Sequence, residues 1–151
     1  MNKMPEIPIP AGLDTRCFVL GEGALKYLPQ LLQQEFPGLT PWVIADTNTW
    51  EAAGARAQEL LAEANMSPAS PYIFPGTPVL HPDFAYSEQL AYVMPDKCVP
   101  VAVGSGVIND LVKCASGLKN VRYCCVPTAC SVDGFTSAGA ALAVNLNKQS
   151  V

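Results

Sequence analysis

Hydrophobic positions along the chain follow two alternating spacings. Short apolar runs, often β-branched, are typical of buried strands and occupy residues 16–20, 41–46, 72–74, 99–103 and 121–126. Between them, apolar residues recur every three or four positions, as on one helix face, over residues 24–35, 50–64, 82–92 and 107–116. This alternation predicts an α/β fold, with a parallel sheet flanked by helices and wound in the right-handed sense.

The second predicted strand ends at a carboxylate. Asp46 is followed by Thr47, Asn48 and Thr49, whose side-chain oxygens are expected to cap a helix that starts near Trp50. A carboxylate at the carboxyl end of an early strand binds the ribose hydroxyls of a dinucleotide and repels a 2′-phosphate. The same carboxylate also suits a turn cap, so both roles for Asp46 stay open.

The strand-like run at residues 99–103 stops at a turn of small residues, Gly104, Ser105 and Gly106. Glycines let the backbone approach a ligand closely, and the amide groups at the start of the following helix attract a phosphate. The turn is not an ordinary Rossmann fingerprint, because Asn109 stands where the third glycine is expected. It is not a Walker loop either, because the Gly-Lys-Ser/Thr ending is missing.

Hydroxyls and a carboxylate follow the last strand-like run. Pro127 breaks that run, and the polar side chains after it are Thr128, Ser131, Asp133 and Ser137. Two parallel strands deliver the loops that follow them to one edge of the sheet, which is where open α/β sheets bind ligands. We therefore expect the glycine turn and this polar loop to form one site.

Composition and charge narrow the class of protein. The chain has 151 residues, 50% of them hydrophobic and 15% charged, which is enough for one domain with a sizeable core. A net charge of -4, with only nine Lys and Arg, argues against a nucleic-acid partner. The opening residues lack the apolar core of a secretory signal, and no apolar run reaches the roughly 20 residues of a membrane helix. We expect a soluble cytoplasmic protein in which residues 1–15 form an extended arm.

The cysteines and the single histidine give little support for a metal site. The six cysteines contain no Cys-x-x-Cys spacing, and Cys124 and Cys125 are adjacent in a predicted strand, so they point to opposite faces. We expect reduced, structural thiols. His81 is the only histidine and lies between leucine and proline in a predicted turn, so neither a metal ligand nor a catalytic residue is expected in this chain.

Two segments resemble the paired motifs of a known family. The segments GSGVINDLVK, residues 104–113, and VPTACSVDGFTS, residues 126–137, are similar to motifs of glycerol-1-phosphate dehydrogenases. That group belongs to the superfamily of glycerol dehydrogenase, iron-containing alcohol dehydrogenase and dehydroquinate synthase. The Asp133-Gly134 pair favours the glycerol-1-phosphate branch, because glycerol dehydrogenases tend to carry Asp-Ala there. Two positions depart from the pattern: Ser105 replaces a glycine, and Cys130 replaces a small apolar residue.

The resemblance implies a Rossmann-like domain that binds NAD or NADP, the amino-terminal part of a dehydroquinate synthase-like fold. It implies that the cofactor contacts Asp46, Gly104, Ser105, Gly106, Val107, Ile108, Thr128, Ala129, Cys130, Ser131 and Ser137. Asp133 is implied to face the substrate. The implied reaction is reversible hydride transfer between NAD(P)H and dihydroxyacetone phosphate, which gives sn-glycerol 1-phosphate.

Members of this family carry a second, helical domain whose Asp and two His bind zinc, nickel or iron. We expect residues 16–151 to be the dinucleotide-binding domain alone, ending before that metal domain, and to be inactive by itself. Alternatives that stay open are a stand-alone, non-catalytic nucleotide-binding module and a glycerol dehydrogenase or dehydroquinate synthase-like enzyme. The expected partner is a small phosphorylated polyol or ketone, and assembly into a homo-oligomer stays open.

Overall fold

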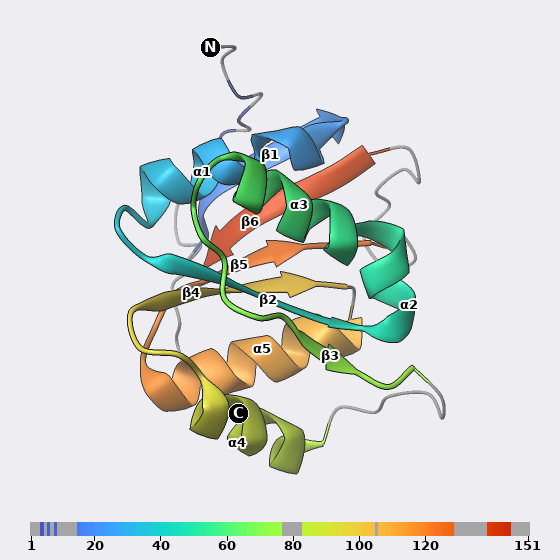
Figure 1. Cartoon of the computed structure of the whole chain (residues 1–151), viewed down its shortest axis with the longest axis vertical. Helices are drawn as coiled ribbons and strands as arrows, with labels where there is room; N and C mark the ends of the chain where they lie inside the picture. Colours follow the sequence, from blue (N-terminus) through green and yellow to red (C-terminus); the bar gives the residue numbers. More distant parts are fainter. Residues whose placement is uncertain are drawn as a thin grey trace.

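A computed structural model describes residues 4, 6, 8, 15–76, 83–104, 106–128 and 139–145. In this part of the chain six strands form one sheet, in the order β1-β6-β5-β4-β2-β3, and helices cover both faces (Figure 1). The strands are β1 (Thr15–Glu22), β2 (Thr40–Asp46), β3 (Tyr72–Phe74), β4 (Cys98–Val103), β5 (Tyr123–Val126) and β6 (Gly139–Asn145). The helices are the 3-10 helix η1 (Ala24–Tyr27), α1 (Leu28–Glu35), α2 (Thr47–Thr49), the π-helical η2 (Trp50–Gly54), α3 (Ala55–Glu63), α4 (Phe84–Val93) and α5 (Gly106–Lys119).

Strands β3, β2, β4 and β5 are parallel, which confirms the predicted parallel sheet flanked by helices. The register pairs Ile44 with Ala102, and Val103 with Val126, so the neighbouring strands end at one level. All four strands were expected from their apolar runs. Strands covered on both faces are apolar throughout, which holds for β2, β4 and β5, whereas the edge strand β3 has one exposed residue, Ile73.

The sheet departs from a purely parallel arrangement at β6. This strand lies between β1 and β5 and is antiparallel to both. Strand β6 therefore separates β1 from the four parallel strands. The strand–helix alternation predicted that neighbouring strands would be parallel throughout, and this was wrong at β6. The pattern missed β6 because residues 139–145 are mostly small and apolar and follow no helical segment.

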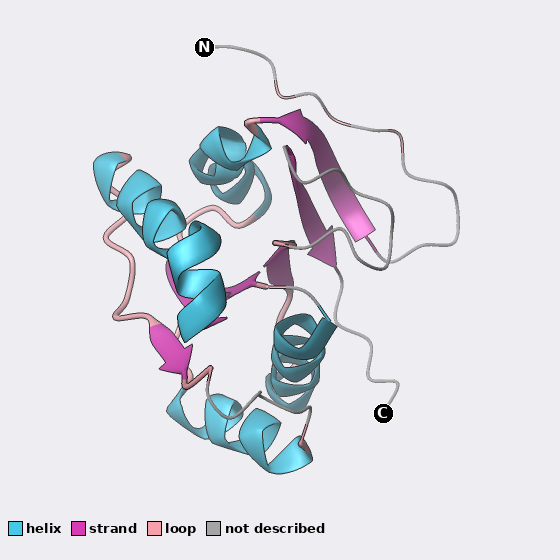
Figure 2. Cartoon of the chain, turned by 90° about the vertical axis from the view of Figure 1, so that its right-hand side faces the viewer, coloured by secondary structure: helices cyan, strands magenta, loops and turns pink. Residues whose placement is uncertain are grey.

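The core is divided into two clusters, one on each face of the sheet. Val43 and Ala45 pack with η1, α1 and α3 on one face, whereas Trp42 and Ile44 pack with α4 and α5 on the other. Figure 2 shows the helices on both sides of the strands. The alternation is that of a pleated strand whose successive side chains point to opposite faces.

The thiols described by the structure are structural. Cys17, Cys98, Cys124 and Cys125 are buried, Cys114 is half-buried, and all five are free, as expected. Burial raises the pKa of Cys17 to about 12 and that of Cys98 to about 11, so both thiols are protonated at neutral pH. Cys130 lies outside the described residues.

The amino-terminal arm touches the domain at the few positions that the structure describes. Met4 is buried in the cluster that includes η1, α1 and α3, and Glu6 forms a single antiparallel bridge with Val19. The Cys17 thiol donates to Glu6 Oε1 at 3.2 Å. Among the described residues, no helix is both long enough and apolar enough to span a bilayer.

Candidate functional site

The carboxyl ends of β2, β4 and β5 bring the described members of the predicted site to one edge of the sheet. Asp46 is the last residue of β2, Gly104 follows β4 directly, and Thr128 stands two residues after β5. Asp46 and Gly104 lie two residues beyond the paired Ile44 and Ala102, so they reach the same level. The Gly104 N–H donates to the carbonyl oxygen of Val126 at 3.0 Å and joins the ends of β4 and β5.

Asp46 caps the helical segment that follows β2. Its Oδ1 accepts the N–H of Thr49 at 2.7 Å, and the Asp46 N–H donates to Thr49 Oγ1 at 3.0 Å, which makes a reciprocal capping box. The helical segment begins at Thr47, so the predicted start near Trp50, with Thr47, Asn48 and Thr49 as caps, was wrong. A carboxylate in the extended conformation just before these residues accepts the free amide more effectively.

The cap uses only one carboxylate oxygen of Asp46. No donor to its Oδ2 is found within the described parts of the chain. The side chain is half-buried, so this second oxygen is left for a ligand to use. Capping and ribose binding are therefore compatible in one residue, and ribose binding by Asp46 stays a prediction.

Gly104 is a glycine for packing reasons. A Cβ at this position would lie 2.7 Å from Cβ of Ile108 and 2.9 Å from its Cγ1, and Ile108 is buried beneath the sheet end. Only a residue without a side chain lets the start of α5 sit this close to the end of β4. Close helix–strand packing, which the sequence interpretation did not consider, accounts for this position.

Gly106 has a different environment. It is the first residue of α5, is exposed, and a Cβ added to it would meet no described heavy atom within 4 Å. The first amide groups of a helix have no partner within the helix and carry its positive dipole end. Val107 next to it packs against the core cluster that includes α4 and α5, whereas Gly106 leaves space, among the described residues, for an anionic group.

The end of β3 also contributes to this edge, which the sequence interpretation missed. Gly76 follows β3 after Pro75, and its N–H donates to Thr47 Oγ1 at 2.8 Å. The sequence of residues 75–78, Pro-Gly-Thr-Pro, is typical of a turn and does not indicate a contact with β2. A Pro-Gly pair directly after a strand is a signal for a close backbone approach. The residue that Gly76 contacts, Thr47, lies 29 positions earlier and is brought there by the pairing of β2 with β3.

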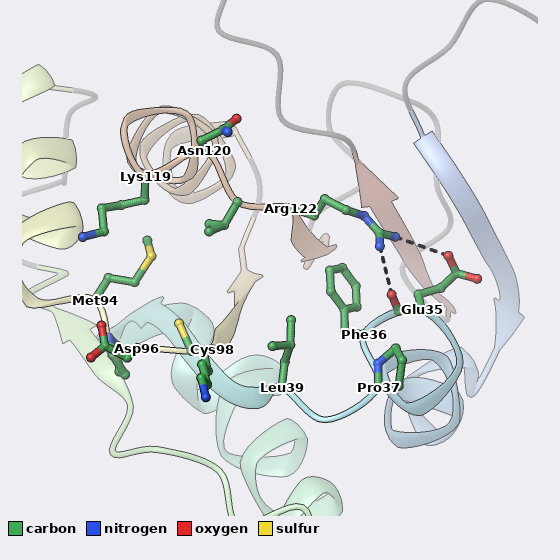
Figure 3. Close-up of a pocket in the computed structure, with 13 residues that line it drawn as sticks. Glu35, Phe36, Pro37, Leu39, Met94, Asp96, Cys98, Lys119, Asn120 and Arg122 are labelled. Carbon is green, nitrogen blue, oxygen red and sulfur yellow. Dashed lines mark hydrogen bonds and ion pairs between the residues drawn. The ribbon is translucent and has the colours of Figure 1, made fainter.

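A cavity of about 560 Å³ lies at the opposite edge, away from the predicted site. Its lining residues precede β2, β4 and β5 or end α1, α4 and α5, and they include Glu35, Phe36, Met94, Cys98, Lys119 and Arg122 (Figure 3).

The basic residues Arg122 and Lys119 of this cavity lie near the carboxyl ends of helices α1 and α5. Arg122 Nη1 donates to the carbonyl oxygen of Glu35 at 2.9 Å, its Nη2 lies 3.3 Å from Glu35 Oε1, and its guanidinium lies 4.5 Å from the Phe36 ring centroid. Lys119 stands in the last turn of α5. Cations near helix carboxyl termini offset the negative dipole end. Helix starts and free amides lie at the other edge, so that edge is the better candidate for an anionic ligand.

Several predicted site residues lie outside the described part of the chain. These are Ser105, Ala129, Cys130, Ser131, Asp133 and Ser137, together with His81. Within the described residues, no group of three or more His, Cys, Asp or Glu side chains is arranged to hold a metal ion.

Comparison with known proteins identifies the family. Residues 19–151 match the iron-containing alcohol dehydrogenase family. The chain is 34% identical over 131 residues to a glycerol-1-phosphate dehydrogenase (NAD(P)+) of Bacillus velezensis, covering 84% of this chain and 32% of that protein. The enzyme of the same name from Bacillus licheniformis is 37% identical over 110 residues, covering 72% of this chain and 27% of the relative.

A third relative, the glycerol-1-phosphate dehydrogenase (NAD(P)+) of Halalkalibacterium halodurans, is 32% identical over 124 residues, covering 80% of this chain and 31% of that enzyme. The chain thus spans about a third of the length of the curated relatives that it matches. This partial coverage and the four parallel strands flanked by helices agree with an amino-terminal domain of such enzymes. The chain therefore belongs to the iron-containing alcohol dehydrogenase family, as the paired motifs indicated.

Proposed function

We propose that this chain is the NAD(P)-binding part of a metal-dependent glycerol-1-phosphate dehydrogenase, which interconverts dihydroxyacetone phosphate and sn-glycerol 1-phosphate by hydride transfer. The observation that carries the proposal is the carboxyl edge of the sheet. There, among the described residues, no donor reaches Oδ2 of Asp46, and no atom lies within 4 Å of a Cβ added at Gly106, the start of α5. This edge belongs to a chain about a third identical to enzymes named for NAD(P)+ and glycerol 1-phosphate.

Each described residue at this edge has a proposed role in holding the dinucleotide. The pyrophosphate lies against the first amides of α5 at Gly106, where no side chain blocks it. Asp46 accepts hydrogen bonds from the adenosine ribose through Oδ2. Gly104 and Ile108 set the distance between β4 and α5 at this edge.

The remaining predicted contacts complete the proposal. Hydroxyl-bearing and small residues allow close approach and donate hydrogen bonds, and here they are Ser105, Thr128, Ala129, Cys130, Ser131 and Ser137. Asp133 binds a hydroxyl of the polyol substrate. When bound, the dinucleotide supplies or accepts the hydride, and the residues of this chain bind and orient it.

The described residues do not fit a catalytic metal ion. They contain no cluster of three metal-ligating side chains, and burial holds the pKa of the Cys17 and Cys98 thiols above neutral pH, which disfavours the thiolate that binds metals. We propose that a separate helical domain provides the metal ligands in the complete enzyme.

Titration calorimetry of NAD and NADP with the chain and with Gly106→Val tests the proposed site. A branched side chain at Gly106 fills the space that the phosphate needs, so binding to the variant is expected to be lost. Ala62→Val is the matched control, because it places the same side chain at an exposed position of α3. No binding by the wild type, or unchanged affinity in Gly106→Val, contradicts the proposal.

A further inference from the structure

The end of β3 is locked to the turn after β2 by a hydrogen bond and a close approach. Besides the 2.8 Å bond from the Gly76 N–H to Thr47 Oγ1, a Cβ at Gly76 would overlap that oxygen and would lie 2.8 Å from Asn48 Nδ2. Carbon–oxygen contacts of this kind do not occur below 3.0 Å. Position 76 therefore accommodates only glycine while Thr47 keeps its place.

This contact is adjacent to the candidate ribose-binding carboxylate. Thr47 follows Asp46 directly, and Asp46 pairs with Phe74 across β2 and β3. The capping box with Thr49 holds the turn from the helix side. The bond from Gly76 holds it from the neighbouring strand, so the direction of the Asp46 side chain depends on both.

We propose that Gly76 and Thr47 act as a positioning pair that orients Asp46 toward the adenosine ribose and thereby sets the preference for NAD over NADP. The inference rests on the proposed dinucleotide site. A carboxylate discriminates against a 2′-phosphate, and binds ribose hydroxyls, only while it is held at hydrogen-bonding distance from them. An alanine at position 76 displaces the Thr47 hydroxyl from the place where it accepts the Gly76 N–H, because the added Cβ overlaps that oxygen.

Variants at the two positions distinguish the effect of the accepting hydroxyl of Thr47 from the effect of the space beside Gly76. Thr47→Ser keeps the accepting oxygen, whereas Thr47→Val keeps the shape and removes that oxygen. Gly76→Ala introduces the clash, and Thr47→Ala in the Gly76→Ala background removes the nearest atom again. Gly38→Ala is the control, because it strains a backbone at φ +80° with nothing near its Cβ.

The measurements are affinities of the full chain for NAD and NADP by calorimetry, with the melting temperature of each variant. The wild type is expected to prefer NAD, and Thr47→Ser to match it. Thr47→Val should weaken NAD binding by about 3- to 10-fold, the net value of the one hydrogen bond with the ribose that a displaced Asp46 loses. It should also reduce the NAD-to-NADP affinity ratio. Gly76→Ala should reduce the ratio further, and the added Thr47→Ala should restore part of it.

Gly38→Ala should lower the melting temperature with the affinity ratio unchanged. Absence of NAD and NADP binding to the wild type overturns the proposed function and this inference with it. A wild type that binds both equally, or variants at Thr47 and Gly76 that keep the wild-type affinity ratio, overturns the positioning role alone. If a variant loses affinity for NAD and for NADP by the same factor, the affinity ratio is unchanged.

Discussion

Substituting Asp46 by alanine or asparagine separates its two roles, helix cap and charge. Alanine removes the acceptor for the Thr49 N–H, which lies 2.7 Å from Oδ1. Loss of an N-cap acceptor costs about 1 kcal/mol, with a range of roughly 0.5–2. For a chain of 151 residues each kcal/mol lowers the melting temperature by about 2–4 °C, so Asp46→Ala should melt about 2–4 °C below the wild type.

Asparagine caps helices as well as aspartate does and carries no charge. Asp46→Asn should therefore keep most of the stability and lose only the attraction between the charge and the helix start. Both variants remove the charge that repels a 2′-phosphate, so both should bind NADP relatively better than the wild type.

Thr49→Val supplies the complementary control. It removes the oxygen that accepts the Asp46 N–H at 3.0 Å but leaves the carboxylate in place. Because the Thr49 N–H still donates to Asp46 Oδ1, the carboxylate keeps its direction, and Thr49→Val should lower the melting temperature while preserving nucleotide preference. Thermal denaturation followed by circular dichroism, together with calorimetry of NAD and NADP, measures both effects. A wild-type melting temperature in Asp46→Ala would refute the capping argument, and a wild-type affinity ratio in Asp46→Asn would refute the charge argument.

Three further predictions concern packing, pH and activity. Gly104→Ala should lower the free energy of unfolding by about 1–3 kcal/mol in urea titrations, because its Cβ would overlap Ile108; wild-type stability contradicts this. The raised pKa of Cys17 stabilises the fold below pH 9, and this stability should fall as pH rises from 9 toward 12; urea titrations of Cys17→Ala should lack that part of the pH dependence. The chain alone should not oxidise NADH with dihydroxyacetone phosphate, with or without zinc or nickel, and turnover on the order of 10 per second would show that its own residues suffice.

Much of the fold follows from local patterns. The apolar runs that became β2, β4 and β5 were recognisable because strands buried on both faces must be apolar throughout, whereas β3, an edge strand with Ile73 exposed, was recognisable from its aromatic and β-branched residues. Parallel strands carry their following loops to the same side, and of the residues predicted to meet there Asp46, Gly104 and Thr128 are described and follow neighbouring strands at that edge. The opposite orientation of Cys124 and Cys125 followed from the period of a strand and is observed.

Other features depend on contacts between distant segments, which local patterns do not encode. Strand β6 acquires its direction by pairing with β1 and β5. The cap at Asp46 is by contrast local, because its hydrogen bonds join it to Thr49 three residues later, and the sequence offered it as one of two roles for this carboxylate.

The same reason applies within the candidate site. Gly104 is required by a side chain four positions later in α5, and Gly76 by a hydroxyl 29 positions earlier. Both glycines lie in segments whose composition is typical of turns, but such a composition indicates only that the backbone bends. Which atoms come within contact distance is decided when the strands pair and the helices pack, so only the tertiary structure distinguishes a glycine needed for packing from one that leaves room for a ligand.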